Sequence, residues 1–313
     1  MFLNGGIARR FLSLPVTTRG CPVIETQGAL LKRHKECALE LAAEVLTSCL
    51  RQLGATPDDV RYLCVVTSTG FLTPGLSALL CHKVGLRRDC TRLDVVGMGC
   101  NAGLNGLTAT TTWAQRHTGL LAIMVCAEIC SAVYVVDDSM QTSVVNSLFA
   151  DGAGAISVIA DGRRDCTGPA ILKFVSSLIP ETLNAMRFDW DDEQGKLKFF
   201  LDRNIPYLIG AHSEEVIDQL LADTGLHRCD IAHWIVHSGG KKVIDAIKVN
   251  SGLTNHDLRH TISVLRDYGN LSSGSFLFSL ERLLQEGATK SGDYGVLMTM
   301  GPGSTIEAAL ARW

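Results

Sequence analysis

The sequence lacks the patterns that mark several classes of protein. Its eleven cysteines are irregularly spaced and no two stand in a Cys-x-x-Cys pair, so we expect neither a zinc cage nor a disulfide framework. Reduced, mostly buried thiols in a cytoplasmic protein explain the cysteines more simply. We expect no signal peptide, because Arg9 and Arg10 follow the short apolar start of the chain instead of preceding it.

Charge is scarce. Only 19% of the residues are charged, the net charge is −3, and the basic residues are scattered along the chain, which argues against nucleic acid as a partner. The most apolar segment, residues 120–136, contains Glu128 and is followed by two aspartates, so it predicts a buried strand and no membrane span. A hydrophobic fraction of 46% beside so few charges favours a subunit interface. We therefore expect a homodimer.

The residues around Cys100 predict a strand, a sharp corner and a helix. An apolar, β-branched run ends at Gly97 and Gly99, and small side chains follow as far as Gly119. Cys100 would then lie at the positive end of a helix, where a thiol loses its proton more easily. The alternative is a small hydrophobic cysteine that fills the junction of a strand and a helix.

The order of elements predicts an internal duplication. The apolar strand of residues 60–69 and the strand of residues 231–240 are of the same kind, and a helix of small residues follows later in each half. We expect halves 1–162 and 163–313, with the boundary within residues 163–169. The other expected elements are helices 25–53, 74–84 and 207–224, strands 91–96 and 294–300, and a strand starting near Leu120.

Two further polar residues stand at the ends of expected elements. His237 closes an apolar strand, and Asn270 precedes a helix. A Cys–His–Asn set suits thioester chemistry, because an imidazole can pair with a thiolate, and imidazole and amide N–H groups can bind a developing oxyanion or enolate. A histidine capped by the backbone and an asparagine at a helix N-cap are the plain alternatives.

Two other segments favour structural roles. Residues 256–260 place two histidines four apart, but they lack the glutamate of a zinc-protease helix and include Arg259, so we expect a surface helix. Residues 300–307 lack the lysine of a phosphate loop, and a tight turn near the active site is the better prediction.

Five segments of the sequence carry a resemblance to a known family: residues 97–107, 147–155, 234–247, 267–284 and 295–307. Together they resemble the type III polyketide synthases, the chalcone synthase-like branch of the thiolase fold. The resemblance runs from about residue 3 to the end of the chain. It implies a duplicated α/β/α layered fold with two halves related by a pseudo-twofold axis. Within the family, residues 67–80 and 99–107 are similar in sequence to bacterial 3,5-dihydroxyphenylacetyl-CoA synthases.

The resemblance also implies roles for individual residues. Cys100 would carry the starter and the growing acyl chain, and His237 with Asn270 would bind the thioester carbonyl of malonyl-CoA as CO2 leaves. Phe149 and Phe199 match the two phenylalanines that stand between the CoA tunnel and the cavity. The substrates would be coenzyme A thioesters, and neither a metal nor an organic cofactor would be needed.

Other positions match the family only in part. Cys130 and Val133 stand where plant enzymes have pocket threonines, so the resemblance implies no plant-type aromatic starter. Arg9 and Arg10 match part of a basic stretch that anchors CoA. Less chain precedes Cys100 than is usual in the family, so we expect an N-terminally shortened fold without the opening strand and helix. The remaining implied substrate-binding residues are Ser272, in the segment after the catalytic asparagine, and Gly303, in the terminal loop.

Three alternatives stay open at this point. A ketoacyl carrier-protein synthase III would use the same three residues for a single condensation, although it usually follows its asparagine with threonine, where Leu271 stands here. A truncated, inactive paralogue could serve in subunit association. A papain-like hydrolase fits less well, because such enzymes are secreted or lysosomal and place the cysteine near the mature N-terminus.

Overall fold

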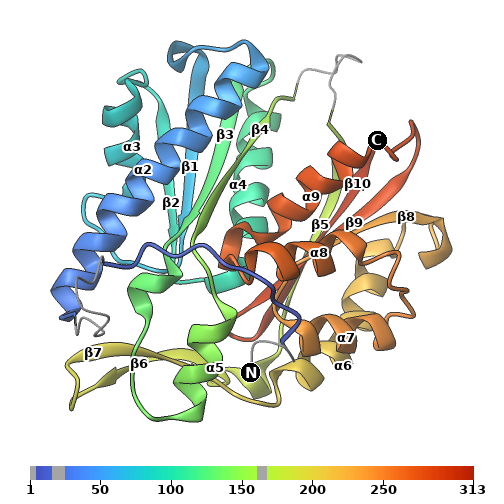
Figure 1. Cartoon of the computed structure of the whole chain (residues 1–313). Helices are drawn as coiled ribbons and strands as arrows, with labels where there is room; N and C mark the ends of the chain where they lie inside the picture. Colours follow the sequence, from blue (N-terminus) through green and yellow to red (C-terminus); the bar gives the residue numbers. More distant parts are fainter. Residues whose placement is uncertain (1–4, 16–24, 161–167) are drawn as a thin grey trace.

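Two four-stranded sheets form the centre of the molecule, and helices cover them (Figure 1). The computed structural model describes residues 5–15, 25–160 and 168–313. In the first sheet the strand order is β2-β1-β3-β4. Strand β1 (Val60–Thr67) runs parallel to β2 (Thr91–Val96) and β3 (Leu121–Glu128), and β4 (Gly152–Val158) is antiparallel to β3.

The second sheet has the order β5-β10-β9-β8. Strand β8 (Ile231–Val236) is parallel to β9 (Tyr294–Gly301), while β10 (Thr305–Arg312) is antiparallel to both β9 and β5 (Ala170–Leu178). A separate hairpin, β6 (Met186–Asp191) and β7 (Lys196–Leu201), lies beside the helix that precedes β4 (Figure 1).

The helices form three layers around the two sheets. Between the sheets, α4 (Ala102–Arg116) and α9 (Ser275–Glu286) share one hydrophobic core with strands of both. The outer face of the first sheet packs on α2 (Gln27–Leu53) and α3 (Leu76–Val84). The outer face of the second sheet packs on α6 (Ile205–Leu221), α7 (Lys241–Asn250) and α8 (Arg259–Tyr268). The predicted layered α/β fold is confirmed.

The apolar strands are buried because both of their faces meet helices. Every residue of β3 is buried, the pattern of a parallel strand covered on two sides. Helix α2 begins where the Thr26 hydroxyl accepts the Ala29 N–H at 3.2 Å and ends at Gly54, which has a left-handed φ of 64°. No helix within the described ranges is long and apolar enough to cross a membrane.

Most predicted elements lie within a few residues of the observed ones, but several were missed. The strand predicted at 91–96 has these bounds, whereas the helix predicted to begin at Pro74 begins at Leu76. The helix predicted at 256–260 is wrong in its first half, because His256 lies in a turn before α8. The expected boundary between the halves stays a prediction, since residues 163–167 lie outside the described part. The strands not predicted are β5, β6, β7 and β10, and only the first two residues of helix α8 fall within a predicted helix.

Candidate active site

Cys100 lies on the predicted corner between β2 and α4. Gly97 and Gly99 have φ angles of 82° and 77°, a left-handed conformation that side chains with a Cβ rarely adopt. A Cβ on Gly99 would also lie 2.2 Å from Cδ of Pro302, in the turn between β9 and β10. That turn therefore packs directly against the backbone that carries the thiol, as predicted for residues 300–307.

The surroundings of Cys100 disfavour ionisation of its thiol. Its side chain is 9% exposed, and Sγ lies 3.5 Å from the Ser272 hydroxyl. Burial raises the pKa of the Cys100 thiol to about 12, the Ser272 hydroxyl opposes this, and the Glu128 charge adds to it. A rise of this size corresponds to about 4 kcal/mol against the thiolate, whereas a helix end contributes only about 0.3–1 kcal/mol in its favour. The helix end alone does not ionise the thiol.

His237 follows the last residue of β8, and its surroundings disfavour the imidazolium form. Its backbone N–H donates to the Met298 carbonyl at 2.8 Å, which continues the ladder between β8 and β9. The side chain is 2% exposed, and burial lowers the pKa of the imidazole to about 3. Nδ1 has no hydrogen-bond partner among the described residues. Burial disfavours each charge of the thiolate–imidazolium pair predicted from the sequence, and the pair stays a prediction.

Asn270 joins the surroundings of the thiol and the imidazole. Its Oδ1 accepts the Ser272 N–H at 2.8 Å, and its Nδ2 donates to the Gly239 carbonyl at 3.4 Å. Ser272 touches Cys100, and Gly239 packs so closely on His237 that a Cβ there would lie 3.1 Å from the ring. Residues from three separate stretches of sequence are thus brought to one point. Asn270 is not a side-chain N-cap, since α9 begins five residues later.

Sequence reasoning missed Glu128, a fully buried carboxyl group beside the thiol. It accepts hydrogen bonds from the Ser68 N–H at 2.9 Å, the Thr69 hydroxyl at 2.9 Å and the Ser273 hydroxyl at 2.5 Å. Burial raises the pKa of Glu128, and these donors oppose the rise. The sequence did contain a signal for this group, a single acidic residue at the end of a long apolar run. Such a residue is expected to be buried, and a buried carboxyl group needs several hydrogen-bond donors around it.

A second buried carboxyl group supports the corner from the opposite sheet. Glu307, on β10, accepts the Ser176 hydroxyl at 2.9 Å and the Asn101 amide at 3.5 Å. Burial raises the pKa of Glu307. Asn101 also fills the space that a side chain on Gly301 would occupy, since a Cβ there would lie 2.1 Å from its Oδ1. The residue after Cys100 is thus held by the C-terminal sheet.

The two phenylalanines implied by the resemblance meet. The rings of Phe149, which follows α5 (Met140–Leu148), and Phe199, on β7, lie 5.7 Å apart with an angle of 87° between their planes. This edge-to-face geometry is favourable for aromatic rings. Phe199 also contacts the Phe188 ring at 5.1 Å. The pair therefore connects the hairpin β6–β7 to the segment that precedes β4.

The remaining predicted residues lie around these groups. Cys130 and Val133 begin and end a short 3₁₀ turn after β3. Cys130 is buried, and burial raises the pKa of its thiol, with a further contribution from the negative charges of Glu128 and Asp151. Gly303 has a φ of 123° in the turn between β9 and β10.

The two predicted CoA-binding arginines differ in exposure and in the groups to which they donate. Arg9 is exposed, and its Nε donates to the Asp267 carbonyl at 3.3 Å. Arg10 is half-buried, and its Nη1 donates inward to the Phe149 carbonyl at 2.8 Å.

No group of three or more acidic, histidine or cysteine side chains within the described ranges is arranged to hold a metal ion. His260, which the sequence pairs with His256, instead contacts the Glu286 carboxylate at 3.0 Å.

Comparison with known proteins identifies the family. The model of FAE1/type III polyketide synthase-like proteins matches residues 17–221, and that of the C-terminal domain of chalcone and stilbene synthases matches residues 171–313. The chain is 60% identical to the 3,5-dihydroxyphenylacetyl-CoA synthase of Streptomyces toyocaensis, over 100% of this chain and 82% of the relative. The chain belongs to the type III polyketide synthases.

Other members of the family agree. The 3,5-dihydroxyphenylacetyl-CoA synthase of Amycolatopsis balhimycina is 59% identical over 100% of this chain and 84% of its own length. The crystal structure of 1,3,6,8-tetrahydroxynaphthalene synthase from Streptomyces coelicolor A3(2) superposes with a TM-score of 0.92 at 26% identity, covering 100% of this chain and 88% of that one. The predicted family, thiolase-like fold and acyltransferase class are confirmed for this type III polyketide synthase.

Proposed function

We propose that this type III polyketide synthase makes 3,5-dihydroxyphenylacetyl-CoA by repeated decarboxylative condensation of malonyl-CoA. The similarity of about 60% over the whole chain to synthases of that name supports the product. The convergence of Cys100, His237 and Asn270 around Ser272 and Gly239 supports the mechanism. The dihydroxyphenylacetyl group has eight carbon atoms, which equal four decarboxylated malonyl units, so no other starter is required.

Loading begins from a neutral thiol and a neutral imidazole. In the free site burial raises the pKa of Cys100 and lowers that of His237, so no charge is stored before the substrate arrives. As the thiol attacks the thioester carbonyl of an acyl-CoA, its proton passes to the imidazole, and coenzyme A leaves with a proton. Proton transfer within the attack avoids a buried thiolate that has no counter-ion.

Extension uses the same imidazole together with the amide. His237 and Asn270 donate hydrogen bonds to the thioester oxygen of malonyl-CoA, and the negative charge left by departing CO2 collects on that oxygen. The resulting enolate carbon attacks the carbonyl of the acyl group on Cys100, the bond to the Cys100 sulfur breaks, and the sulfur takes up a proton. The chain, longer by two carbons, is then held on the coenzyme A of the malonyl unit and is transferred back to Cys100 for the next extension. Because the surroundings are buried, these donors act at low dielectric and stabilise the enolate more than exposed donors would.

The chamber for the growing chain would be lined by residues around the thiol. Ser272 lies 3.5 Å from the Cys100 thiol, Cys130 and Val133 belong to the turn after β3, and Gly303 belongs to the turn that packs on Gly99. Phe149 and Phe199 would separate this chamber from the path of coenzyme A. The exposed guanidinium of Arg9 would bind the phosphates of coenzyme A, and no metal or organic cofactor would take part.

A homodimer would form through β2, which is the outer strand of the first sheet. Leu93, Val96 and Met98 are 37–39% exposed there, an apolar surface on a strand edge that a second copy can cover. Changing Val96 to Asp should halve the mass measured by light scattering. The matched control, Leu172→Asp on the outer strand β5, should leave it unchanged, and an unchanged mass in both variants would contradict this interface.

A cytoplasmic location accords with the cysteines, because all nine in the described ranges are free thiols.

The product assignment is tested with purified protein and malonyl-CoA as the sole substrate. Liquid chromatography with mass spectrometry should detect a dihydroxyphenylacetyl thioester, and carbon-13 malonyl-CoA should label all eight acyl carbons. A four-carbon acyl product would show a single condensation, and complete recovery of malonyl-CoA would show that the chain is inactive; either result contradicts the proposal.

A further inference from the structure

The first described segment, residues 5–15, runs across both halves of the molecule and is called the strap here. Figure 1 shows it as a dark-blue trace that crosses the molecule towards the start of α2. The N–H groups of Ala8 and Arg9 donate to the Arg266 carbonyl on α8 at 2.7 and 3.3 Å. Farther along, the Phe11 carbonyl accepts the Asp151 N–H at 2.9 Å. The strap thus bonds to the C-terminal half first and to the N-terminal half afterwards.

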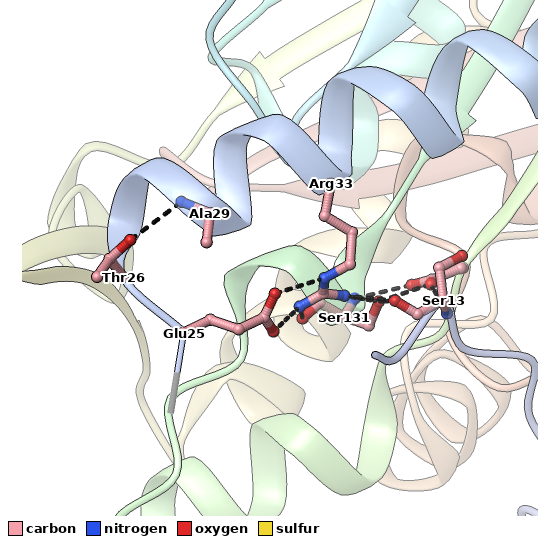
Figure 2. Close-up of polar contacts among 7 residues, drawn as sticks. Ser13, Glu25, Thr26, Ala29, Arg33 and Ser131 are labelled. Atoms are coloured by element: carbon pink, nitrogen blue, oxygen red, sulfur yellow. Dashed lines mark hydrogen bonds and ion pairs between the residues drawn. The ribbon is translucent and has the colours of Figure 1, made fainter. Parts of the chain in front are cut away.

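A half-buried arginine of α2 holds the far end of the strap (Figure 2). Arg33 donates to the Ser13 carbonyl at 2.6 Å and to the hydroxyl of Ser131 at 2.8 Å, while Glu25 pairs with it at 2.6 Å. The Ser13 N–H donates to a carboxylate oxygen of Asp151 at 2.5 Å. Because these contacts fix the strap on both sides of Arg10, that side chain has little freedom to turn outward.

Arg10 projects from the strap onto the backbone of Phe149. Its Nη1 donates to the carbonyls of Phe149 at 2.8 Å and Asn146 at 2.5 Å, and to the Tyr134 hydroxyl at 3.0 Å. The Tyr134 hydroxyl in turn donates to the same Phe149 carbonyl at 2.6 Å. A guanidinium donates stronger hydrogen bonds than a neutral group, so the orientation of this peptide is determined by Arg10 and Tyr134 together.

The same peptide is paired with the catalytic asparagine. Phe149 and Asn270 form an isolated parallel β-bridge, in which the Asn270 N–H donates to the Leu148 carbonyl at 2.9 Å and the Ala150 N–H donates to the Asn270 carbonyl at 2.8 Å. The aliphatic part of Arg10 also packs on Gly269, where a Cβ would lie 2.9 Å from the Arg10 Cγ. Arg10 therefore contacts both strands of the bridge at once.

We propose that Arg10 is a positioning residue, which holds the backbone of Phe149 against that of Asn270 and so sets the catalytic amide and the Phe149 ring relative to each other. The proposal rests on the roles given above to Asn270 and Phe149. It replaces the prediction that Arg10 binds coenzyme A, because its contacts point to the protein interior. A catalytic group displaced by about 1 Å can lose about 10²-fold in rate, so the expected effect lies in turnover.

The test compares Arg10→Met with Arg9→Met in steady-state release of CO2 from malonyl-CoA. For Arg10→Met we expect kcat to fall about 10–100-fold while KM stays within about twofold. For its neighbour Arg9, whose side chain is exposed, we expect KM to rise and kcat to stay unchanged. A raised KM with normal kcat in Arg10→Met would mean that Arg10 binds coenzyme A, and normal values of both would mean that it positions nothing; each result overturns the proposal.

Tyr134→Phe keeps the proposal testable if Arg10→Met does not fold. This variant removes one hydroxyl from the same Phe149 carbonyl, so we expect a smaller loss of kcat, again at constant KM. When both variants fold, the double variant should lose less than the product of the two single losses, because both act on one peptide. Multiplicative losses, or an unaffected Tyr134→Phe, would contradict the proposal. A wild-type protein that releases no CO2 would overturn the proposed function and this inference with it.

Discussion

The two halves of the chain begin their central strands in the same way. Before β1, the backbone N–H of Thr56 donates to the Asp59 carboxylate at 2.7 Å, and before β8, that of His227 donates to Asp230 at the same distance. A short 3₁₀ turn lies between the two residues in each case. The start of the strand is therefore the same structural unit used twice.

The strand registers also agree, down to one irregularity. In the first half, β1 and β3 begin their pairing at Val60 and Leu121, and the register shifts by one residue before the next pair. In the second half, β8 and β9 begin at Ile231 and Tyr294, and the same shift follows. Counting six residues on from Val60 and from Ile231 sets Val66 against His237. Counting seven residues on from Leu121 on β3 and from Tyr294 on β9 sets Glu128 against Gly301.

The corners that carry Cys100 and Ser272 are equivalent as well. Each is a 3₁₀ turn that leads directly into the helix between the sheets, and the first residues, Gly99 and Ser272, have positive φ angles of 77° and 49°. The second residues are Cys100 and Ser273. A thiol in one half therefore corresponds to a hydroxyl group in the other, which donates to Glu128 at 2.5 Å.

The comparison shows how one scaffold yields an asymmetric site. At each equivalent position only one half has the reactive group: the thiol and the carboxyl group come from the first half, and the imidazole comes from the second. The counterpart of the imidazole is an isopropyl group, and that of the carboxyl group is glycine, whose missing side chain makes room for Asn101. The proposed site therefore needs residues of both halves.

The largest expected effect follows from making the second half like the first at His237. His237→Val introduces the residue found at the equivalent position of β1 and removes both the proton acceptor and one donor to the malonyl oxygen. We expect release of CO2 from malonyl-CoA to fall about 10³-fold, within the range for general-base and oxyanion groups. Stopped assays with carbon-14 malonyl-CoA measure it. Retention of a tenth or more of the wild-type rate would remove His237 from the mechanism.

The proposed role of Cys100 is tested by replacing it with serine, the residue at the equivalent position of the second half. Cys100→Ser introduces the side chain of the equivalent residue, and because a hydroxyl is a much weaker nucleophile than a thiol, we expect condensation to fall by about 10² or more while CO2 release is largely kept. Intact-protein mass spectrometry should show an acyl adduct on the wild type during turnover and none on the variant. An adduct of equal yield on the variant would place the acyl group on another residue.

The sequence predicted the scaffold well because its signals are local. Apolar runs that end in glycine mark β1, β3 and the Cys100 corner, and Cys100, His237 and Asn270 all stand at the ends of elements, where polar groups reach a site. Strand β5 was missed because it joins the sheet through pairing with residues more than a hundred positions away, as between Leu178 and Thr305. Single-sequence patterns do not contain that pairing.

The charge states could not be predicted from the sequence. Placing Cys100 at a helix end favoured a thiolate, but ionisation depends on burial, which only the assembled fold supplies. The roles of Glu128 and Glu307 were missed for the same reason, because their partners Ser273 and Asn101 come from the opposite half. The inward direction of Arg10 likewise required the strap to be placed in space.

The charge state of Cys100 is open to a direct measurement. Because burial raises its pKa to about 12, the thiolate fraction should increase about tenfold for each pH unit between pH 7 and 9. The rate of Cys100 alkylation by iodoacetamide, followed by peptide mass spectrometry, should rise accordingly without a plateau. His237→Gln should leave this slope unchanged. A rate independent of pH in the wild type would mean that a thiolate–imidazolium pair already exists in the free enzyme.

The smallest effect tests the duplicated turns themselves. Asp59→Ala and Asp230→Ala each remove the acceptor of one backbone N–H at the start of a central strand, so both should lower the melting temperature at pH 7 slightly and by similar amounts. Hydrogen bonds from Thr56 lower the pKa of Asp59, so its stabilisation is complete above the unfolded-state pKa and is lost as the pH falls through the lower folded-state value. Calorimetry of the two variants at neutral and acid pH measures both effects. A markedly larger loss for one variant at pH 7 would mean that the two halves, though alike in geometry, do not depend equally on the same turn.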